Sequence, residues 1–299
     1  MQLRVKFLHS DKSRERDLAK AFYDGVRRCG EIAFTEPLSA MPKLDGIDVA
    51  VMVGVKSRRL FQRCLEAKVV PVVLDKGYCR SRAAGSRVWE YWRVSIAEHH
   101  PTRWLYNGKA KKDRWEKLGL KTEHWRGNGL QIVLAGSSQK YHDFYGLPDP
   151  TTWAKQVIAE IRKHSDRPII YRPKPSWDGA VPIEGTYYSD KNDNINRVLL
   201  NSWALVTHGS NACFEAALHG IPSIVLGNAV AKPISSIDLA EIEDPRMEDR
   251  GQWLQRLAYW QWTEDEMARG STWNFIRPMI ADILDGKESW PETVNNAEQ

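Results

Sequence analysis

The chain has 299 residues, of which 42% are hydrophobic and 27% are charged. This length suits two domains, and the composition excludes collagen-like, low-complexity and wholly disordered proteins. The net charge of +5 is unevenly distributed: residues 1–129 hold 27 Lys and Arg against 15 Asp and Glu, whereas residues 130–299 hold 16 against 23. The basic first half favours a polyanionic partner, whether nucleic acid, an anionic membrane or an acidic glycan.

Strands and helices alternate in the first 75 residues. The pattern predicts a strand at 3–8 and an amphipathic helix at 13–28 that ends at Gly30. Apolar strands at 48–55 and 69–74 flank a helix at 57–67. Continuous apolar runs are typical of strands buried on both faces of a parallel sheet, so we expect a doubly wound domain.

The pattern lapses between residues 76 and 128 and then resumes. Strands are predicted at 131–135, 168–171, 203–207 and 222–226, and helices at 152–164, near 194–201 and at 211–219. We therefore expect two domains, residues 1–128 and 129–299. Residues 250–284 indicate amphipathic helices that can cross back to the first domain. Their packing periodicity places Trp253, Trp260, Trp262 and Trp273 in the core.

The cysteines and the hydropathy pattern bear on the cellular compartment in which the protein is expected. Cys29, Cys64, Cys79 and Cys213 lie far apart without CxxC spacing, which favours buried thiols in a reducing environment over a disulfide framework or a zinc site. The sequence has no signal-peptide core and no apolar run approaching 18 residues. We expect a monomeric cytoplasmic protein without a membrane span, in the host cytoplasm if the chain is viral.

The sharpest motif is residues 203–228, WALVTHGSNACFEAALHGIPSIVLGN. A buried strand ends at Thr207, and a small polar turn leads into a helix whose free N–H groups and dipole favour an anion. The turn consists of His208, Gly209, Ser210 and Asn211. Glu215, one turn into the helix, can accept hydrogen bonds from a ribose diol. The same succession of strand, turn and helix is also common in α/β proteins without a ligand at that turn. Two interpretations of the segment therefore remain: a phosphate site or a simple connection.

Two further segments point to the same chemistry. In IIYRPKPS (169–176), prolines stiffen the backbone around Arg172 and Lys174, which favours a small anionic ligand over a solvated strand end. In AGSSQKYHDFYGLPDP (135–150), the polar residues follow a strand, where ligands of open α/β sheets gather. The candidates there are Gly136, Ser137, Ser138 and Lys140, with His142 and Asp143 as secondary catalytic candidates; a simple connection is the alternative.

Residues 203–228 resemble the nucleotide-binding helix in the second domain of GT-B fold glycosyltransferases, especially the capsule-type and sialyltransferase-type enzymes. Glu215-Ala216 and Gly220-Ile221-Pro222 match that pattern. The segment 169–176 is similar to their His-Pro or Lys-Pro element, with Lys174 where the commoner version has His. The resemblance covers roughly residues 130–230. It implies two Rossmann-like doubly wound domains facing across a cleft, with a nucleotide sugar, most readily a UDP-sugar, held by the second domain.

An inverting glycosyl transfer needs a base that takes the proton of the acceptor hydroxyl. In the first domain, His9 and Asp11 follow the first strand, where the cleft of such a domain should lie. Glu98 is a third candidate, and it precedes His99 and His100. Asp11 also suits the N-cap of the following helix, and the two histidines suit a polar turn.

Residues 56–126 carry 18 Lys and Arg against 7 Asp and Glu. Within them, KGYCRSRAAGSRVWEYWRV interleaves cations with aromatic rings, and such pairs neutralise phosphates and stack on bases. The candidates for nucleic-acid binding are Arg80, Arg82, Arg87, Trp89, Trp92 and Arg93. The alternative is a solvated loop whose tryptophans pack into the core.

The residues and the resemblance together predict a glycosyltransferase. The favoured acceptor is a 5-hydroxymethylpyrimidine in double-stranded DNA, because the first half is basic and the chain resembles the phage enzymes that glycosylate their own DNA. We expect transfer of a hexose or pentose. No DxD-like element follows a strand, so we expect this transfer to need no metal. The alternatives are a polysaccharide or lipid-linked glycan acceptor, a nucleotide-sugar epimerase of the same fold, and a non-enzymatic nucleic-acid-binding protein.

Overall fold

The structure is a computed structural model that describes residues 2–38, 42–54, 57–79, 91–190 and 192–290. The chain forms two compact α/β units. Unit 1 contains the described residues of 2–101 together with 259–290, and unit 2 contains those of 102–258. The tail after residue 258 therefore belongs to the same unit as the first hundred residues.

The unit 1 sheet has the strand order β11-β5-β4-β3-β1-β2 within the described residues. The strands β1 (Arg4–His9), β2 (Ile32–Pro37), β3 (Val49–Val53) and β4 (Val70–Lys76) are parallel. The strands β5 (Trp92–Ile96) and β11 (Gln261–Trp262) extend the sheet in antiparallel fashion. Every residue of β3 is buried, as its uninterrupted apolar sequence predicts.

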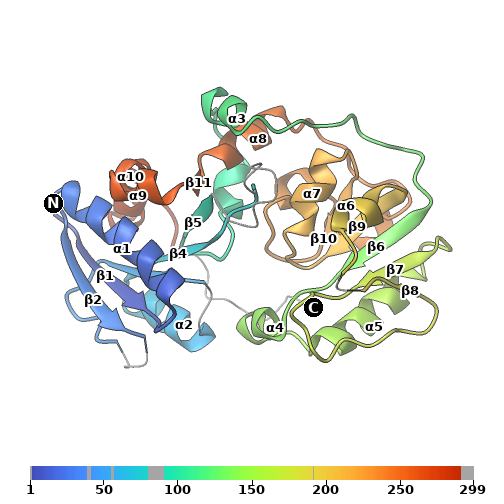
Figure 1. Cartoon of the computed structure of the whole chain (residues 1–299), viewed down its shortest axis with the longest axis horizontal. Helices are drawn as coiled ribbons and strands as arrows, with labels where there is room; N and C mark the ends of the chain where they lie inside the picture. Colours follow the sequence, from blue (N-terminus) through green and yellow to red (C-terminus); the bar gives the residue numbers. More distant parts are fainter. Residues whose placement is uncertain (1, 39–41, 55–56, 80–90, 191, 291–299) are drawn as a thin grey trace. The chain divides into compact units, whose positions relative to one another are not determined.

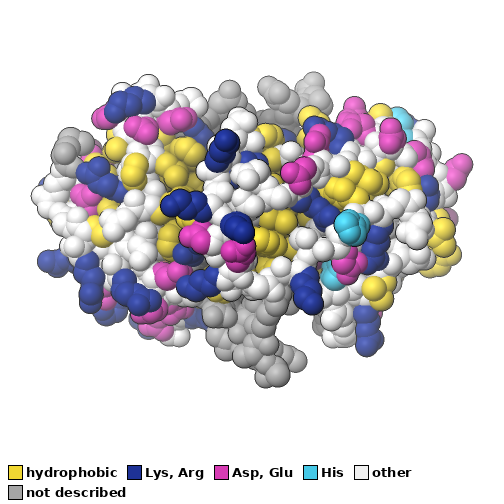
Figure 2. Space-filling model, turned by 90° about the horizontal axis from the view of Figure 1, so that it is seen from above, with side chains coloured by type: hydrophobic (Ala, Val, Ile, Leu, Met, Phe, Trp, Pro, Cys, Tyr) yellow, Lys and Arg dark blue, Asp and Glu magenta, His cyan; other side chains and the backbone are white. Residues whose placement is uncertain are grey.

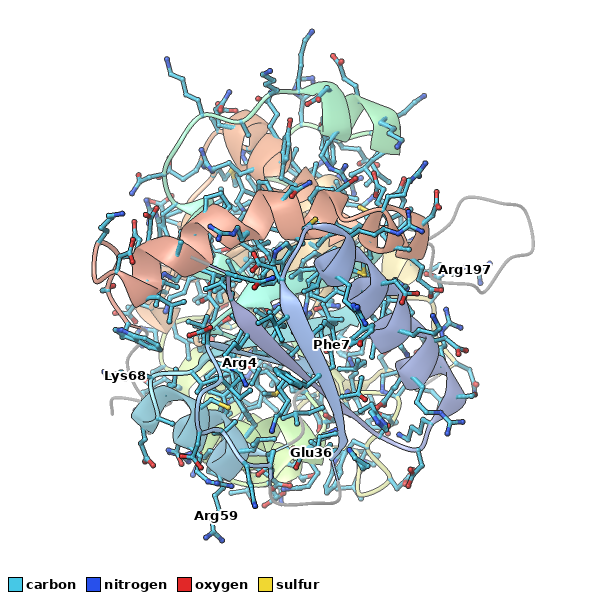
Figure 3. The ribbon with its side chains drawn as sticks, turned by 90° about the vertical axis from the view of Figure 1, so that its left-hand side faces the viewer. Arg4, Phe7, Glu36, Arg59, Lys68 and Arg197 are labelled. Atoms are coloured by element: carbon cyan, nitrogen blue, oxygen red, sulfur yellow. The ribbon has the colours of Figure 1, made fainter. Side chains whose placement is uncertain are left out.

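Helices from both ends of the chain cover this sheet. The helix α1 (Ser13–Arg28) has the predicted bounds, and α2 (Arg58–Glu66) begins after Ser57, whose hydroxyl caps it. The tail adds α9 (Glu264–Ala268) and α10 (Ser271–Leu284), which contact α1. Edge-to-face ring contacts link Phe7 to Phe22 and Phe22 to Trp273, so β1, α1 and α10 share one core. Figure 3 labels Phe7 on β1.

The unit 2 sheet is parallel, with the order β10-β9-β6-β7-β8 (Figure 1). Its strands are β6 (Gln131–Ala135), β7 (Ile169–Arg172), β8 (Tyr187–Tyr188), β9 (Ser202–Thr207) and β10 (Ser223–Val225). The connecting helices are α4 (Gln139–Tyr145), α5 (Pro150–Ile161), α6 (Ile195–Leu199) and α7 (Ala212–Leu218). Two 3-10 turns, η2 (Lys232–Ile234) and η3 (Leu239–Glu241), follow β10.

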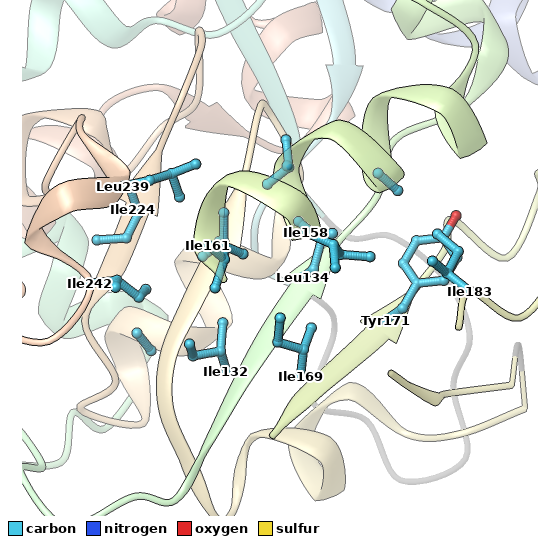
Figure 4. Packing of buried hydrophobic residues seen from close by; sticks show 14 of the residues in the cluster. Ile132, Leu134, Ile158, Ile161, Ile169, Tyr171, Ile183, Ile224, Leu239 and Ile242 are labelled. Atoms are coloured by element: carbon cyan, nitrogen blue, oxygen red, sulfur yellow. The ribbon is translucent and has the colours of Figure 1, made fainter. Parts of the chain in front are cut away.

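The core of unit 2 lies between α5 and one face of this sheet (Figure 4). Alternate residues of the strands, Ile132 and Leu134 on β6 and Ala204 and Val206 on β9, belong to this cluster. The intervening residues Val133, Leu205 and Val225 are also fully buried, so both faces of the sheet are covered. Buried parallel strands of this kind hold the loops at their ends in fixed positions.

The expected domain boundary at 127–129 lies inside unit 2. Residues before it form η1 (Thr102–Leu105) and α3 (Asp113–Leu118), which pack on α8 (Gly251–Ala258). Arg256 donates to the carbonyl of Leu105 over 2.8 Å, and Arg114 donates to the carbonyl of Ala258 over 3.2 Å. These contacts tie residues 102–118 to unit 2 although no sheet strand lies among them.

The side chains predicted to be core are largely buried. Trp253, Trp260, Trp262 and Trp273 are at most 4% exposed, which confirms their assignment to the core. Cys64, Cys79 and Cys213 are buried, and Cys29 is half-buried. Among the described residues, no helix has the length and apolar character needed to cross a membrane.

Candidate functional site

The parallel strands of unit 2 bring three predicted segments together. β6, β7, β9 and β10 end at the same edge of the sheet, with Ala135 paired to both Arg172 and Thr207, and Thr207 paired to Val225. We call this the carboxyl edge of unit 2: residues 136–141, 172–174, 207–211 and 226–232. It contains nine of the ten residues predicted to bind a nucleotide, and the tenth, Glu215, lies in the first turn of α7.

Short backbone contacts fix the turns at this edge. Gly136 donates its N–H to the carbonyl of Arg172 over 2.9 Å, and a Cβ at Gly136 would lie 3.3 Å from the Cα of Pro173. The hydroxyl of Thr207 donates to the carbonyl of Ala135 over 2.9 Å and accepts from the N–H of Ser210 over 3.0 Å. The loops after β6, β7 and β9 are therefore joined by hydrogen bonds or direct backbone packing.

A buried pair of side chains, Tyr141 and His208, forms the floor of this edge. The Tyr141 hydroxyl lies 2.9 Å from Nδ1 of His208 and donates to the carbonyl of Asn228 over 3.4 Å. Two glycines make room for the pair: a Cβ at Gly209 would lie 1.8 Å from the Tyr141 hydroxyl, and one at Gly227 would lie 2.1 Å from the His208 ring. The tyrosine was absent from the predicted site, although it falls within the segment 135–150.

His208 at this edge and the adjacent His142 both have lowered pKa values. Burial, together with the nearby charges of His142 and Lys232, lowers the pKa of His208 to about 4. Burial also lowers the pKa of His142, whose Nδ1 donates to the carbonyl of Pro148 over 2.6 Å. His208 is therefore neutral at pH 7, so it can offer a hydrogen bond but no positive charge.

The hydroxyl groups at this edge are arranged around the starts of two short helices. Ser137 is 6% exposed, and Ser138 caps α4 by accepting from the N–H of Tyr141. Before α7, the hydroxyl of Ser210 accepts from the N–H of Ala212 over 3.3 Å. Asn211 and Glu215 are half-buried, so part of each side chain faces solvent.

The predicted cations at this edge have different surroundings. Arg172 is half-buried and donates to the hydroxyl of Ser189 over 2.9 Å and to the carbonyl of Asp193 over 2.8 Å. Its guanidinium therefore organises the loop 189–193, a role that its position before a proline does not predict. Lys140 and Lys174 are exposed. Lys232, which no sequence pattern singled out, lies at the end of the loop that follows β10.

A hollow in unit 2 lies away from the carboxyl edge. It has a volume of about 590 Å³ and is lined by residues 162–167 and Glu243, beyond the C-terminus of α5 and before β7. Arg167 pairs with Glu243 at 3.0 Å, and Ser165 donates to the same carboxylate over 2.5 Å. Its polar groups bind one another at the amino edge of the sheet, away from the carboxyl edge where ligands of such sheets bind.

The three predicted bases lie in unit 1. His9 ends β1 and is half-buried, whereas Asp11 is exposed. Lys12 occupies the N-cap position of α1, so Asp11 does not have the capping role that was its alternative. Glu98 is half-buried and follows Ala97, whose φ of +61° is unusual for a residue with a side chain.

The predicted nucleic-acid contacts of unit 1 are divided. Arg80, Arg82, Arg87 and Trp89 lie outside the described residues. Trp92 is 5% exposed and donates to Glu264 over 2.9 Å, and Arg93 is 2% exposed. Trp92 and Arg93 are thus enclosed by unit 1 itself and do not present their side chains to a polyanion.

Arg93 belongs to a buried polar group that the sequence did not predict, the Arg93 cluster (Asp75, Tyr78, Arg93, His99 and His100). Nη2 of Arg93 lies 3.0 Å from Asp75 and 2.6 Å from Nε2 of His99. The Tyr78 hydroxyl lies 2.7 Å from Nδ1 of His100. Burial raises the pKa of Asp75, but the Arg93 cation and the His99 hydrogen bond lower it more, so the net pKa lies below its ordinary value.

Comparison with known proteins identifies structures with a similar fold. No family model and no curated protein matches this chain. Two solved structures are similar over most of their length, and both come from KpsC of Thermosulfurimonas dismutans. Its β-Kdo 2,4 transferase has a TM-score of 0.54 at 13% identity, covering 87% of this chain and 92% of the other. Its β-Kdo 2,7 transferase has a TM-score of 0.53 at 13% identity, covering 90% and 99%.

The likeness confirms the predicted fold class, an α/β protein of the GT-B type with two Rossmann-like domains. Both KpsC structures are named as β-Kdo transferases. At 13% identity the shared property is the fold, and function has to be argued from the residues of this chain.

Proposed function

We propose that this chain is a glycosyltransferase that binds a nucleotide sugar at the carboxyl edge of unit 2. The observation that carries the proposal is the assembly of Ser137, Ser210 and Asn211, with two lysines, around the ends of adjacent parallel strands. Hydroxyl groups, backbone N–H groups and ammonium groups are the donors that stabilise a departing phosphate. The fold supports the proposal because the two similar solved structures are glycosyltransferases.

Each group at this edge has a role in the proposed reaction. The hydroxyls of Ser137 and Ser210 donate to phosphate oxygens, and Glu215 accepts from the ribose of the nucleotide. The neutral His208 and the Tyr141 hydroxyl hold the turn rigid without repelling or attracting the phosphate. The charge that develops on the leaving nucleotide is then met by lysines, so the proposed transfer needs no metal.

The second part of this proposal concerns the acceptor of the sugar. We retain double-stranded DNA with a 5-hydroxymethylpyrimidine as the first candidate, because residues 56–126 have a large excess of Lys and Arg. On the face shown in Figure 2, Lys and Arg side chains are interspersed with Asp and Glu. An acidic glycan would meet the same charges. Asp11, His9 and Glu98 remain the candidates for the base that activates the acceptor hydroxyl.

The test is release of free nucleotide from a panel of UDP-, CMP-, GDP- and dTDP-sugars. Each sugar is incubated with the full chain alone, with hydroxymethylated duplex DNA, with unmodified DNA and with an acidic polysaccharide. We expect one donor to be consumed, and consumption to rise with the modified DNA. Stimulation by the polysaccharide alone would contradict the DNA acceptor. No consumption of any donor under any condition would contradict the glycosyltransferase.

A matched pair of variants links this activity to the site. Ser210→Ala removes a hydroxyl from the carboxyl edge, and Ser271→Ala removes an exposed hydroxyl at the start of α10. We expect the first variant to lower the rate of nucleotide release by about tenfold or more and the second to leave it unchanged. Equal rates in the two variants would place the chemistry elsewhere.

A further inference from the structure

The cations predicted at the carboxyl edge of unit 2 are either exposed or directed at a loop of the same unit. Arg172 directs its guanidinium to Ser189 and to the backbone of the loop 189–193. His208 is neutral at pH 7. Lys140 and Lys174 are exposed, and each interacts with another group. A phosphate beside the turn between β9 and α7 would therefore bind more strongly if a cation on a fixed part of the backbone lay next to it.

The loop that follows β10 supplies one, and four consecutive residues of that loop are held in place. Gly227 packs against the ring of His208, and the carbonyl of Asn228 accepts from Tyr141. The hydroxyl of Thr102 donates to the carbonyl of Ala229 over 3.1 Å, and the indole of Trp253 donates to the carbonyl of Val230 over 3.0 Å. A loop with so many contacts fixes the position of the residues that follow it.

Lys232 is the next charged residue and the first residue of η2. Its neighbour Ala231 is fully buried. Pro233 restricts the backbone directly after Lys232. The lysine is half-buried, and among the described residues its ammonium has no ion-pair partner.

We propose that Lys232 binds a phosphate group of the donor nucleotide beside the turn between β9 and α7. The inference rests on the proposed function, because it assigns a residue to the same donor site. Lys232 acts as a point charge that pairs with phosphate oxygens, whereas Ser210 and the backbone of the turn supply directed hydrogen bonds. The step is binding alone, and no covalent bond forms or breaks at the lysine.

The test measures the affinity of the full chain for UMP, UDP, CMP, CDP, uridine and cytidine by titration calorimetry. Lys232→Ala is compared with Lys155→Ala, which removes an exposed lysine on α5. We expect Lys232→Ala to weaken the binding of the preferred nucleotide by about tenfold or more, and Lys155→Ala to leave it unchanged. Binding of the nucleoside without phosphate should be equal in both variants.

The outcomes separate the inference from the proposed function. If the wild-type chain binds a nucleotide and both lysine variants bind it equally well, the assignment of Lys232 is overturned and the donor site stands. If the wild-type chain binds none of the nucleotides, both are overturned. Retention of the wild-type thermal transition in Lys232→Ala shows that the loss is not due to unfolding.

A second measurement tests the position of the ammonium without any ligand. The rings of Tyr141 and Tyr145 contact the ring of His208, and the charges of His142 and Lys232 contribute to its lowered pKa. In an NMR titration of the histidine ring, Lys232→Ala should raise the pKa of His208 towards its ordinary value, whereas Lys155→Ala should not. An unchanged pKa in Lys232→Ala would mean that the ammonium lies away from the site.

Discussion

The carboxyl edge of unit 2 and the Arg93 cluster of unit 1 use polar residues in opposite ways. At the unit 2 edge, the floor is a neutral Tyr141–His208 pair, and Gly209 and Gly227 leave room for its two side chains. In unit 1, a nearly fully buried arginine is matched by a carboxylate and two histidines of the same unit. The first arrangement suits an external anion, and the second stabilises a strand pair internally.

The largest effect is expected from a substitution that removes the carboxylate of the Arg93 cluster. Asp75→Asn leaves Arg93 buried without its counter-charge, which should destabilise unit 1 by about 3 kcal/mol. Nucleotide binding by unit 2 should be unchanged at temperatures where unit 1 stays folded. Urea unfolding and calorimetric titration measure the two effects, with the exposed Asp17→Asn on α1 as the control. An equal free energy of unfolding in both variants would contradict the structural role of the cluster.

The next prediction overpacks the floor of unit 2. Gly209→Ala places a methyl group 1.8 Å from the present position of the Tyr141 hydroxyl, so the Tyr141–His208 pair must move. We expect a loss of about 2 kcal/mol in the stability of unit 2 and weaker nucleotide binding. Gly127→Ala is the matched control, because a Cβ there meets no atom within 4 Å. Wild-type stability and affinity in Gly209→Ala would show that the floor does not constrain the site.

A third prediction uses pH. The folded state holds the pKa of His208 at about 4, below its unfolded value of about 6.5, so the unfolded state binds more protons between these values. Stability is therefore complete above pH 6.5 and falls as the pH decreases towards 4, by about 2 kcal/mol at pH 5. His208→Asn should lose less stability between pH 7 and pH 5 than the wild type or the exposed His164→Asn. An identical loss in all three would contradict the buried neutral imidazole.

The smallest expected effect concerns Arg172. If its guanidinium organises the loop 189–193, Arg172→Ala should cost about 1 kcal/mol and speed hydrogen exchange in that loop. Its effect on nucleotide affinity should be smaller than that of Lys232→Ala. The exposed Arg197→Ala is the control. A larger loss of affinity in Arg172→Ala than in Lys232→Ala would restore the arginine as the principal phosphate ligand.

The sequence predicts elements whose partners are near in the chain. The bounds of α1 and β6 agree with their predicted ranges because their periodicity and flanking signals are local. β5 and β11 were missed because their residues alternate poorly, and each becomes a strand by pairing with the other or with β4. The tail helices were predicted from their local amphipathic periodicity, although their partner α1 lies more than 230 residues away in the chain.

In the candidate site, too, the residues that could be predicted are those with local sequence signals. Ser137 and Ser210 could be predicted because both follow buried strands, and parallel strands bring their ends to one edge. The sequence did not predict the engagement of Arg172, because its partners belong to a later loop. It did not indicate Lys232 either, since this residue is placed by packing of residues 227–231 and follows no motif. Arg93 looked like a phosphate ligand because its counter-charge, Asp75, lies on another strand and its other partner, His99, lies in a later turn.

The most direct test of the proposed donor site is NMR chemical-shift mapping with the nucleotide sugar that the donor panel selects. Shifts of the backbone amides should concentrate at residues 136–141, 207–212 and 228–232, and the ring of His208 should respond. The amides of the Arg93 cluster should stay unperturbed by the donor. Shifts confined to unit 1, or to the hollow at residues 162–167, would contradict a donor site at the carboxyl edge of unit 2.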